Sequence, residues 1–203
     1  MRTQMALLSL AGIAFAGCST SSTEPQTGST VELFADYPVY DSATIVQESA
    51  IIVEGNVVST EPTVLTPRYD GDSPEENALV GLTEEEKAKA ISQNDGVAGT
   101  LVHLHVNKVH KGAVNAGDEI VIVQTGGTQD DVLYVVEGTT ILQAGTDYLL
   151  FAAESLDGAY AILGGPAGTY YANDDNDFVA AAPESAPFKV LTESETDTLV
   201  VDK

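Results

Sequence analysis

Apolar and polar residues alternate along several short stretches of this chain, and most of these stretches end at a turn that contains glycine. The clearest stretch is 101–111, where Leu104 and Val106 alternate with His103 and His105. A period of two residues is typical of a strand with one buried face. Runs rich in β-branched residues predict further strands at 51–58, 119–124 and 132–136.

The second half of the chain continues this pattern. The segment 142–152 predicts a turn followed by a strand, which pairs with 159–163 across the turn at 156–158. Another hairpin is expected to pair 169–171 with 178–180. Many short strands with glycine turns predict an antiparallel, all-β domain with minor α content. A small barrel is favoured, because closing the sheet removes its exposed edges.

Capping residues predict three short helices. Asp41 or Ser42 begins a helix just before the strand at 51. Thr83 and Glu86 have the spacing of a capping box, which predicts a polar helix at about 84–92. Thr192 and Glu195 repeat that spacing near the C-terminus, where we expect a short helix or a frayed tail.

These elements predict four parts of the chain. Residues 1–17 are expected to be a lipoprotein signal peptide, and residues 18–40, rich in Ser, Thr, Gly and Pro at their start, a flexible tether. The β domain is expected at 41–182, with a mostly polar insertion at 60–98. Residues 183–203 form the C-terminal tail or short helix.

The N-terminal sequence has the features expected of a membrane anchor. Arg2 precedes an apolar run too short to cross a bilayer core of ~30 Å, and the run ends at Phe15-Ala16-Gly17-Cys18. This tetrapeptide resembles the lipobox of bacterial lipoproteins, although Phe15 stands where Leu is usual. The resemblance implies that diacylglyceryl is attached to Cys18 after cleavage before it, which anchors the protein at the extracytoplasmic face of the membrane. The alternative is a plain secretory signal, cleaved after Ala16.

The charge of the chain limits the classes of partner that it is expected to bind. It contains 8 Lys and Arg against 31 Asp and Glu, a formal net charge of −23. Non-specific binding to nucleic acid depends on basic residues that neutralise phosphates, so we expect no nucleic-acid partner. An anionic lipid surface repels the domain for the same reason, which leaves the acyl groups on Cys18 as the expected membrane contact.

The order of motifs in the domain resembles uncharacterised Gram-positive secreted proteins and, more distantly, netrin modules and metalloproteinase-inhibitor domains. The shared signals are IIVEGNVV at 51–58, VHLHVNKVHKG at 102–112 and GTDYLLF at 145–151. The resemblance implies an OB-like β-barrel. Netrin modules contain disulfides, whereas this domain has no cysteine, and the inhibitors use a free N-terminal cysteine that would here be lipidated. Their inhibitory mechanism is therefore not carried over.

Two groups of side chains are candidate metal ligands. His103 and His105 lie on one face of the expected strand, where two imidazoles can reach one Zn²⁺, and His110 lies near its end. The alternative is that they cover the solvent face of a half-buried strand.

Asp174, Asp175 and Asp177 supply the hard oxygen ligands that Ca²⁺ prefers, as do Asp70 and Asp72. Neither group has the spacing of an EF-hand loop. The alternative for the first group is a hairpin turn, in which Asn and Asp tolerate left-handed backbone.

The sequence contains neither of the nucleophile motifs G-x-S-x-G and S-x-x-K, and neither a P-loop nor a dinucleotide-binding fingerprint. Five tyrosines are candidates for a ligand-binding face, with core packing as the alternative: Tyr134, Tyr148, Tyr160, Tyr170 and Tyr171. The favoured function is a non-catalytic binding module, anchored by lipid at the cell surface, for an unknown protein or small ligand. An extracytoplasmic hydrolase and a divalent-cation-dependent surface module are the alternatives.

Overall fold

The computed structural model of the chain describes residues 29–66, 69, 71–74, 77–93, 96–155 and 158–200. The expected signal peptide, the lipobox with Cys18, and Asp70 lie outside these residues. Strands predominate and the helices are short, so the predicted all-β class with minor α content is confirmed.

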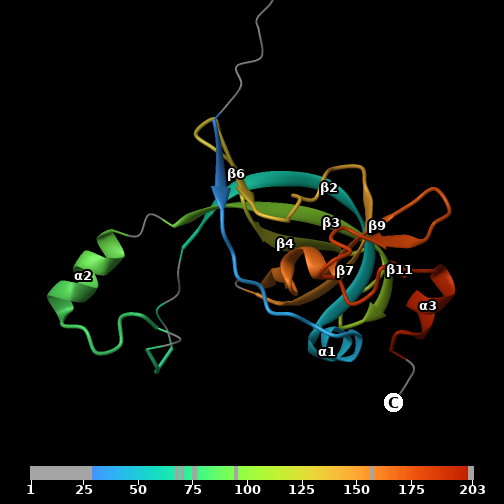
Figure 1. The fold of residues 1–203 in the computed structure, drawn as a ribbon, viewed down its shortest axis with the longest axis horizontal. Helices are drawn as coiled ribbons and strands as arrows, with labels where there is room; N and C mark the ends of the chain where they lie inside the picture. The colour runs from blue at the N-terminus through green and yellow to red at the C-terminus, as the bar shows by residue number, and fades with distance from the viewer. Residues whose placement is uncertain are drawn as a thin grey trace, which may run out of the picture.

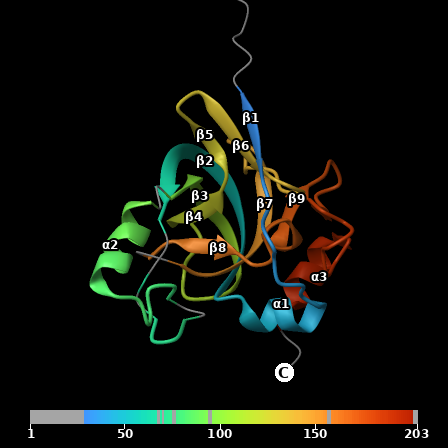
Figure 2. The ribbon, with the colours of Figure 1, turned by 60° about the vertical axis from the view of Figure 1, so that its left-hand side comes forward.

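Five strands pair in a closed ring (Figures 1 and 2). Going round the ring, each neighbouring pair is antiparallel except β4 and β8, which are parallel, and β7 completes the circuit by pairing with both β8 and β2. The five strands are β2 (Ile51–Leu65), β3 (Val97–Lys111), β4 (Glu119–Thr125), β8 (Tyr160–Ile162) and β7 (Asp147–Glu154).

Two apolar clusters stabilise the ring, and they share strands β2 and β7. Ile51 and Leu150 pack in the first cluster, whereas their chain neighbours Ile52 and Leu149 pack in the second. Successive residues of a strand point to opposite faces, so both faces of these two strands are buried. This burial explains why their sequences are continuous apolar runs rather than alternating ones.

Further strands extend the architecture on either side. Three strands continue the sheet beyond β7: β9 (Thr169–Ala172), β10 (Phe178–Ala180) and β11 (Val190–Leu191). A separate sheet has the order β1 (Thr30–Leu33), β6 (Val132–Val136) and β5 (Gly127–Gln129), with β1 parallel to β6.

The N-terminal segment differs from the tether expected at 18–40. Residues 30–33 form strand β1, because they pair in register with residues 133–136 of β6. Tyr37 and Tyr40 then lie beside a short 3₁₀ helix, η2 (Gly165–Gly168). The first strand of the domain therefore begins about ten residues before the expected boundary at 41.

The three helices begin where the capping residues predict. Asp41 caps α1 (Ser42–Glu48), and complete capping boxes begin α2 (Glu84–Ser92) and α3 (Glu193–Thr198). Helix α1 covers the second apolar cluster through Ile45, which is fully buried. No helix among the described residues is both long and apolar enough to cross a membrane.

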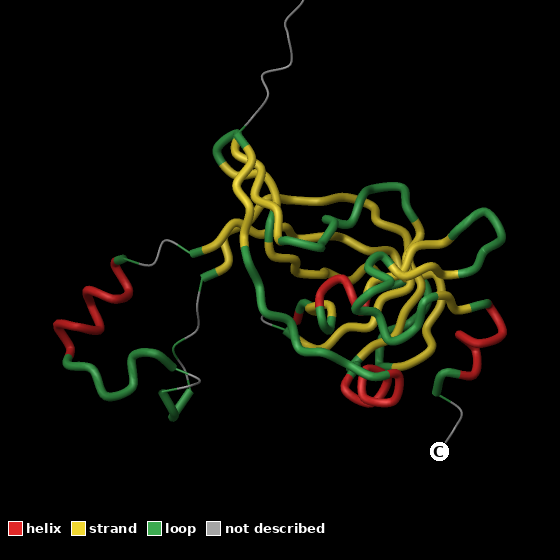
Figure 3. Tube along the Cα trace, viewed as in Figure 1, coloured by secondary structure: helices red, strands yellow, loops and turns green. Residues whose placement is uncertain are grey.

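The insertion occupies the connection between β2 and β3. Strand β2 continues to Leu65 and β3 begins at Val97, so both ends of the segment expected as insertion at 60–98 are paired strand. Helix α2 stands away from the ring in Figures 1 and 3, and none of its described residues is buried. The insertion thus projects from the end of a long two-stranded ribbon.

Candidate functional site

The outer face of strands β2, β3 and β4 carries a row of apolar side chains that the core does not use. Glu61 pairs in register with Leu101, Leu101 with Val123, and His103 with Val121. Paired residues on neighbouring strands project to the same side. Their chain neighbours project inward, where Val102 and Ile122 lie among the buried core residues.

The apolar members of this row, Leu101, Val121 and Val123, line a groove with a volume of about 450 Å³. It lies between the stem of the insertion and the connection from β7 to β8. Its lining is largely apolar and includes Thr63, Val64, Leu65, Thr66, Leu101, Val121, Val123, Ser155, Gly158 and Ala159. We call this feature the outer groove.

A glycine, Gly99, helps to shape the outer groove because it has no side chain. Leu65 lies over Gly99, and a Cβ atom at Gly99 would lie 2.5 Å from Leu65 Cγ. No real contact is that short, so any side chain at Gly99 would displace Leu65. The glycine therefore allows Leu65 to lie flat against the neighbouring strand and form part of the lining.

An acid–histidine–acid row borders the outer groove. His103 Nδ1 lies 3.1 Å from Glu119 Oε1, a hydrogen-bonding distance, while His103 Nε2 lies 3.7 Å from Glu61 Oε1. The two carboxylates are more than half exposed, at 63% for Glu61 and 57% for Glu119, whereas the His103 side chain is 24% exposed. The row thus presents two accessible negative groups beside an apolar surface.

The row differs from the zinc site considered for His103 and His105. Its two carboxylates face different nitrogens of the His103 imidazole. The imidazole therefore lies between the carboxylates, and the three side chains do not converge on one metal position. His105 is exposed and pairs in register with Asn56 and Glu119. Among the residues that the structure describes, no three His, Cys, Asp or Glu side chains gather as metal ligands.

His110 has a different environment. Its side chain is only 4% exposed, and its Nε2 lies 2.7 Å from Glu54 Oε1. Lys108 forms an ion pair with Asp197 of α3 and lies 3.7 Å from Glu54. The hydrogen bond between Lys108 and Asp197 raises the pKa of the lysine and lowers the pKa of the carboxyl group. The cluster of Glu54, Lys108, His110 and Asp197 therefore joins β2, β3 and the C-terminal helix.

Sequence reasoning placed His110 with the other histidines and missed its partner. The available signal was Glu54, the single charged residue within the apolar run 51–58. A carboxylate in such a run requires a partner, because an unpaired buried charge is costly. The antiparallel pairing of β2 and β3 places His110, which is 56 residues further along the chain, beside Glu54.

The candidate calcium ligands lie in the hairpin that joins β9 and β10. Asn173 Oδ1 accepts hydrogen bonds from the backbone N–H groups of Asp175 and Asp177, both at 2.9 Å. Asn176 adopts left-handed backbone with φ of 62°. Asp174 and Asp175 are exposed at the tip. These contacts account for the sequence of the loop as a hairpin turn.

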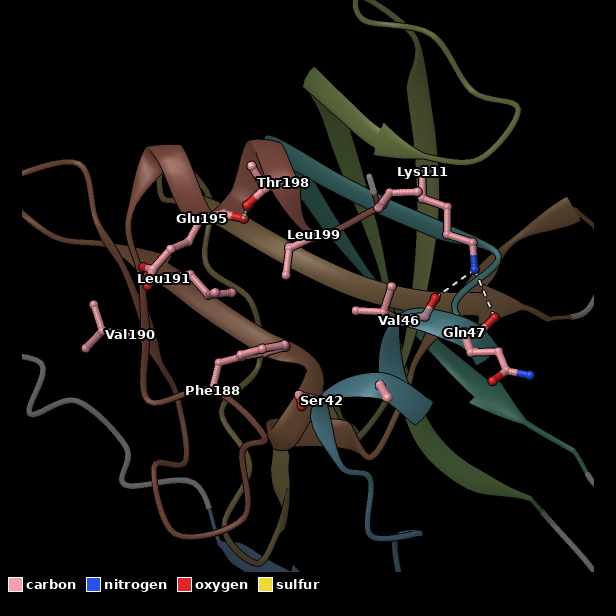
Figure 4. Close-up of a pocket in the computed structure, with 12 residues that line it drawn as sticks. Ser42, Val46, Gln47, Lys111, Phe188, Val190, Leu191, Glu195, Thr198 and Leu199 are labelled. Atoms are coloured by element: carbon pink, nitrogen blue, oxygen red, sulfur yellow. Dashed lines mark hydrogen bonds between the residues drawn. The ribbon is translucent and has the colours of Figure 1, made fainter. Parts of the chain in front are cut away.

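A larger groove, of about 600 Å³, lies between α1 and α3 (Figure 4). Leu191 and Leu199 line it on the α3 side, and Val46 on the α1 side. Lys111 Nζ donates hydrogen bonds to the carbonyl oxygens of Val46 and Gln47, at 2.7 and 2.9 Å. A cation at the end of a helix satisfies its last carbonyl groups.

Four apolar side chains of that larger groove belong to the second cluster or pack against it, so the groove follows the seam along which α3 docks on the core: Val46, Phe188, Leu191 and Leu199. The outer groove, by contrast, is lined mostly by half-buried or exposed residues of the outer face and of the neighbouring connections, and charged groups border it. For this reason we take the outer groove as the candidate functional site.

The five tyrosines do not gather on one face. Tyr148 packs in the first cluster and Tyr170 in the second, on opposite sides of the sheet. Tyr170 is fully buried, and its hydroxyl oxygen accepts a hydrogen bond from the N–H of Phe188. Burial raises the pKa of Tyr170 to about 12. Tyr134 lies in β6, Tyr160 packs against the first cluster, and Tyr171 is 42% exposed.

No known protein-family model matches the chain, and no curated protein matches it in sequence. The functional argument therefore depends on the outer groove and on the fold that forms it.

Proposed function

We propose that the protein is a non-catalytic binding module, held by lipid at the extracytoplasmic face of the bacterial membrane, and that its ligand occupies the outer groove. The observation that carries the proposal is an apolar groove on the outside of a closed ring, bordered by accessible carboxylates.

The strand order of the ring supports this choice of site. In an OB-like barrel, ligands bind on the face of the second and third strands, between the loop that follows the first strand and the loop that joins the fourth and fifth. Here the second and third strands of the ring are β3 and β4. The corresponding loops are the insertion after β2 and the connection between β7 and β8, and residues at both border the outer groove. This part of the argument is an analogy of fold, and the groove itself supplies the independent support.

The expected location rests on the sequence. The single cysteine of the chain, Cys18, lies at the position that lipid attachment requires. Two or more acyl chains give stable anchoring, which one chain does not. In this proposal the expected tether would link the lipid on Cys18 to strand β1.

The proposal is tested by site-specific photo-cross-linking in cells that make the full protein. A photoreactive amino acid replaces Val123 inside the outer groove or, as a control, Leu133 on β6, which is 40% exposed. We expect a discrete adduct from the photoreactive residue at position 123. The adduct should be lost when Val121→Asp places a charge in the lining of the outer groove. Equal labelling at both positions, or an adduct that survives Val121→Asp, would contradict the proposal.

A further inference from the structure

We infer that the ligand of the outer groove is an extended segment of a partner protein that carries apolar residues and one basic residue, whose cationic group binds the exposed carboxylates of Glu61 and Glu119 beside His103. The inference rests on the proposed function and names the chemistry of its ligand.

The acid–histidine–acid row provides the charge complementarity. The 3.1 Å contact of His103 identifies Glu119 as the nearer partner, and the 3.7 Å separation from Glu61 is too long for a direct hydrogen bond. Both carboxylates also remain accessible to a ligand. The planar donor group of arginine suits carboxylates especially well.

The length of the site suits an extended peptide segment. Glu61 and Leu65 are four residues apart on β2 and project to the same face, so their Cα atoms are separated by about 13 Å. A ligand must span that distance to contact the carboxylates and the apolar end together. About four residues of extended chain do so.

The charge of the whole molecule favours a basic partner over a second copy. The formal net charge is −23, so two copies repel each other and a basic segment is attracted. The attraction should weaken as salt screens it.

The inference is tested with three capped tetrapeptides that share apolar residues at three positions and carry Arg, Gln or Glu at the fourth. Binding to the domain is followed by NMR chemical-shift changes. We expect the Arg peptide to bind about fivefold more tightly than the Gln peptide, with shifts centred on His103, Leu101 and Val123. The Glu peptide should bind more weakly than both, and added salt should reduce the preference for Arg.

Matched variants separate local recognition from overall charge. Glu61→Gln with Glu119→Gln removes two negative charges at the outer groove, and Asp174→Asn with Asp175→Asn removes two at the β9–β10 hairpin. Only the first pair should abolish the preference for Arg over Gln. Equal binding of the Arg and Gln peptides to the unaltered protein would overturn the inference while leaving the groove as a binding site. Shifts that lie elsewhere in the domain would overturn it as well.

The two proposals fail separately. If cross-linking at Val123 succeeds and the peptides show no preference for a basic residue, the inferred ligand chemistry is wrong and the binding site remains. If cross-linking fails at Val123, the proposed function is wrong, whatever the peptides do.

Discussion

His110 and Glu54 form a largely buried pair in which His110 Nε2 lies 2.7 Å from Glu54 Oε1. The pair joins the start of β2 to the end of β3, at the opposite end of this hairpin from the insertion. Asp197 Oδ1 lies 3.9 Å from the other ring nitrogen of His110, which connects the pair to helix α3. We therefore interpret His110 as a structural residue that connects the ring to the C-terminal helix.

This interpretation predicts a clear difference between two histidines of β3. His110→Phe fills a similar volume but removes the hydrogen bond to Glu54, and we expect it to lower the free energy of unfolding by about 1–3 kcal/mol. His105→Phe changes an exposed side chain, so its effect should stay within about 0.5 kcal/mol. Urea denaturation at pH 7 measures both. Equal stability of the two variants would show that the buried pair contributes little.

Tyr170 predicts a loss of stability in alkali. Its pKa is 10.0 in an ordinary environment and about 12 in the fold, because burial disfavours the phenolate. The folded state thus holds the proton more tightly than the unfolded chain. The contribution is fully present below pH 10 and is lost as the pH rises toward 12.

The variant Tyr170→Phe isolates this effect. It should cost about 0.5–1.5 kcal/mol at pH 7, because the N–H of Phe188 loses its acceptor. Stability should then fall less steeply above pH 10 than it does in the unaltered protein. Denaturant titrations at a series of pH values measure the two slopes. Tyr171→Phe, on the exposed neighbouring position, is the control, and a matching change of slope in it would refute the assignment.

Local signals in the sequence predicted the helices well. A capping box is complete within four residues, so Thr83 with Glu86 and Thr192 with Glu195 could be recognised without any tertiary information. Strand alternation was equally clear in β3, because Leu104 and Val106 face the core while His103 and His105 face outward. The order of these elements was sufficient for the all-β class.

What the sequence could not indicate depends on contacts between distant segments. Strand β1 exists because residues 30–33 meet β6 about a hundred residues later, and nothing local distinguishes them from a tether. The partners of His103 likewise come from β2 and β4, through pairing that sequence spacing does not specify. The outer groove became visible only when the register placed Leu101, Val121 and Val123 on one face.

The packing of Tyr37 on Gly165 predicts how the N-terminal segment is held. Gly165 adopts a left-handed conformation with φ of +54°, and a Cβ atom there would lie 2.6 Å from Tyr37 Cζ. We expect Gly165→Ala to destabilise the domain by about 2–4 kcal/mol, through backbone strain and displacement of the tyrosine ring. Thermal and urea unfolding measure the loss.

A second glycine separates the two causes. Gly145 also has a positive φ, +78°, but nothing lies within 4 Å of its Cβ position. Gly145→Ala should therefore cost only about 1–2 kcal/mol, from backbone strain alone. If Gly165→Ala costs no more than Gly145→Ala, the contact with Tyr37 does not hold the segment tightly.

The lipid anchor predicts a modification that a mass measurement detects directly. If Cys18 carries diacylglyceryl, the mature protein begins at Cys18, has the added acyl mass and partitions into detergent. Cys18→Ala should leave the chain uncleaved, or release it into the aqueous phase, because the thiol is the site of attachment. Ser19→Ala is the matched control, since it changes the neighbouring residue and keeps the thiol. A mature form that begins at Gly17, carries no added mass and stays in the aqueous phase would exclude the anchor, and it would require the module to act as a secreted protein.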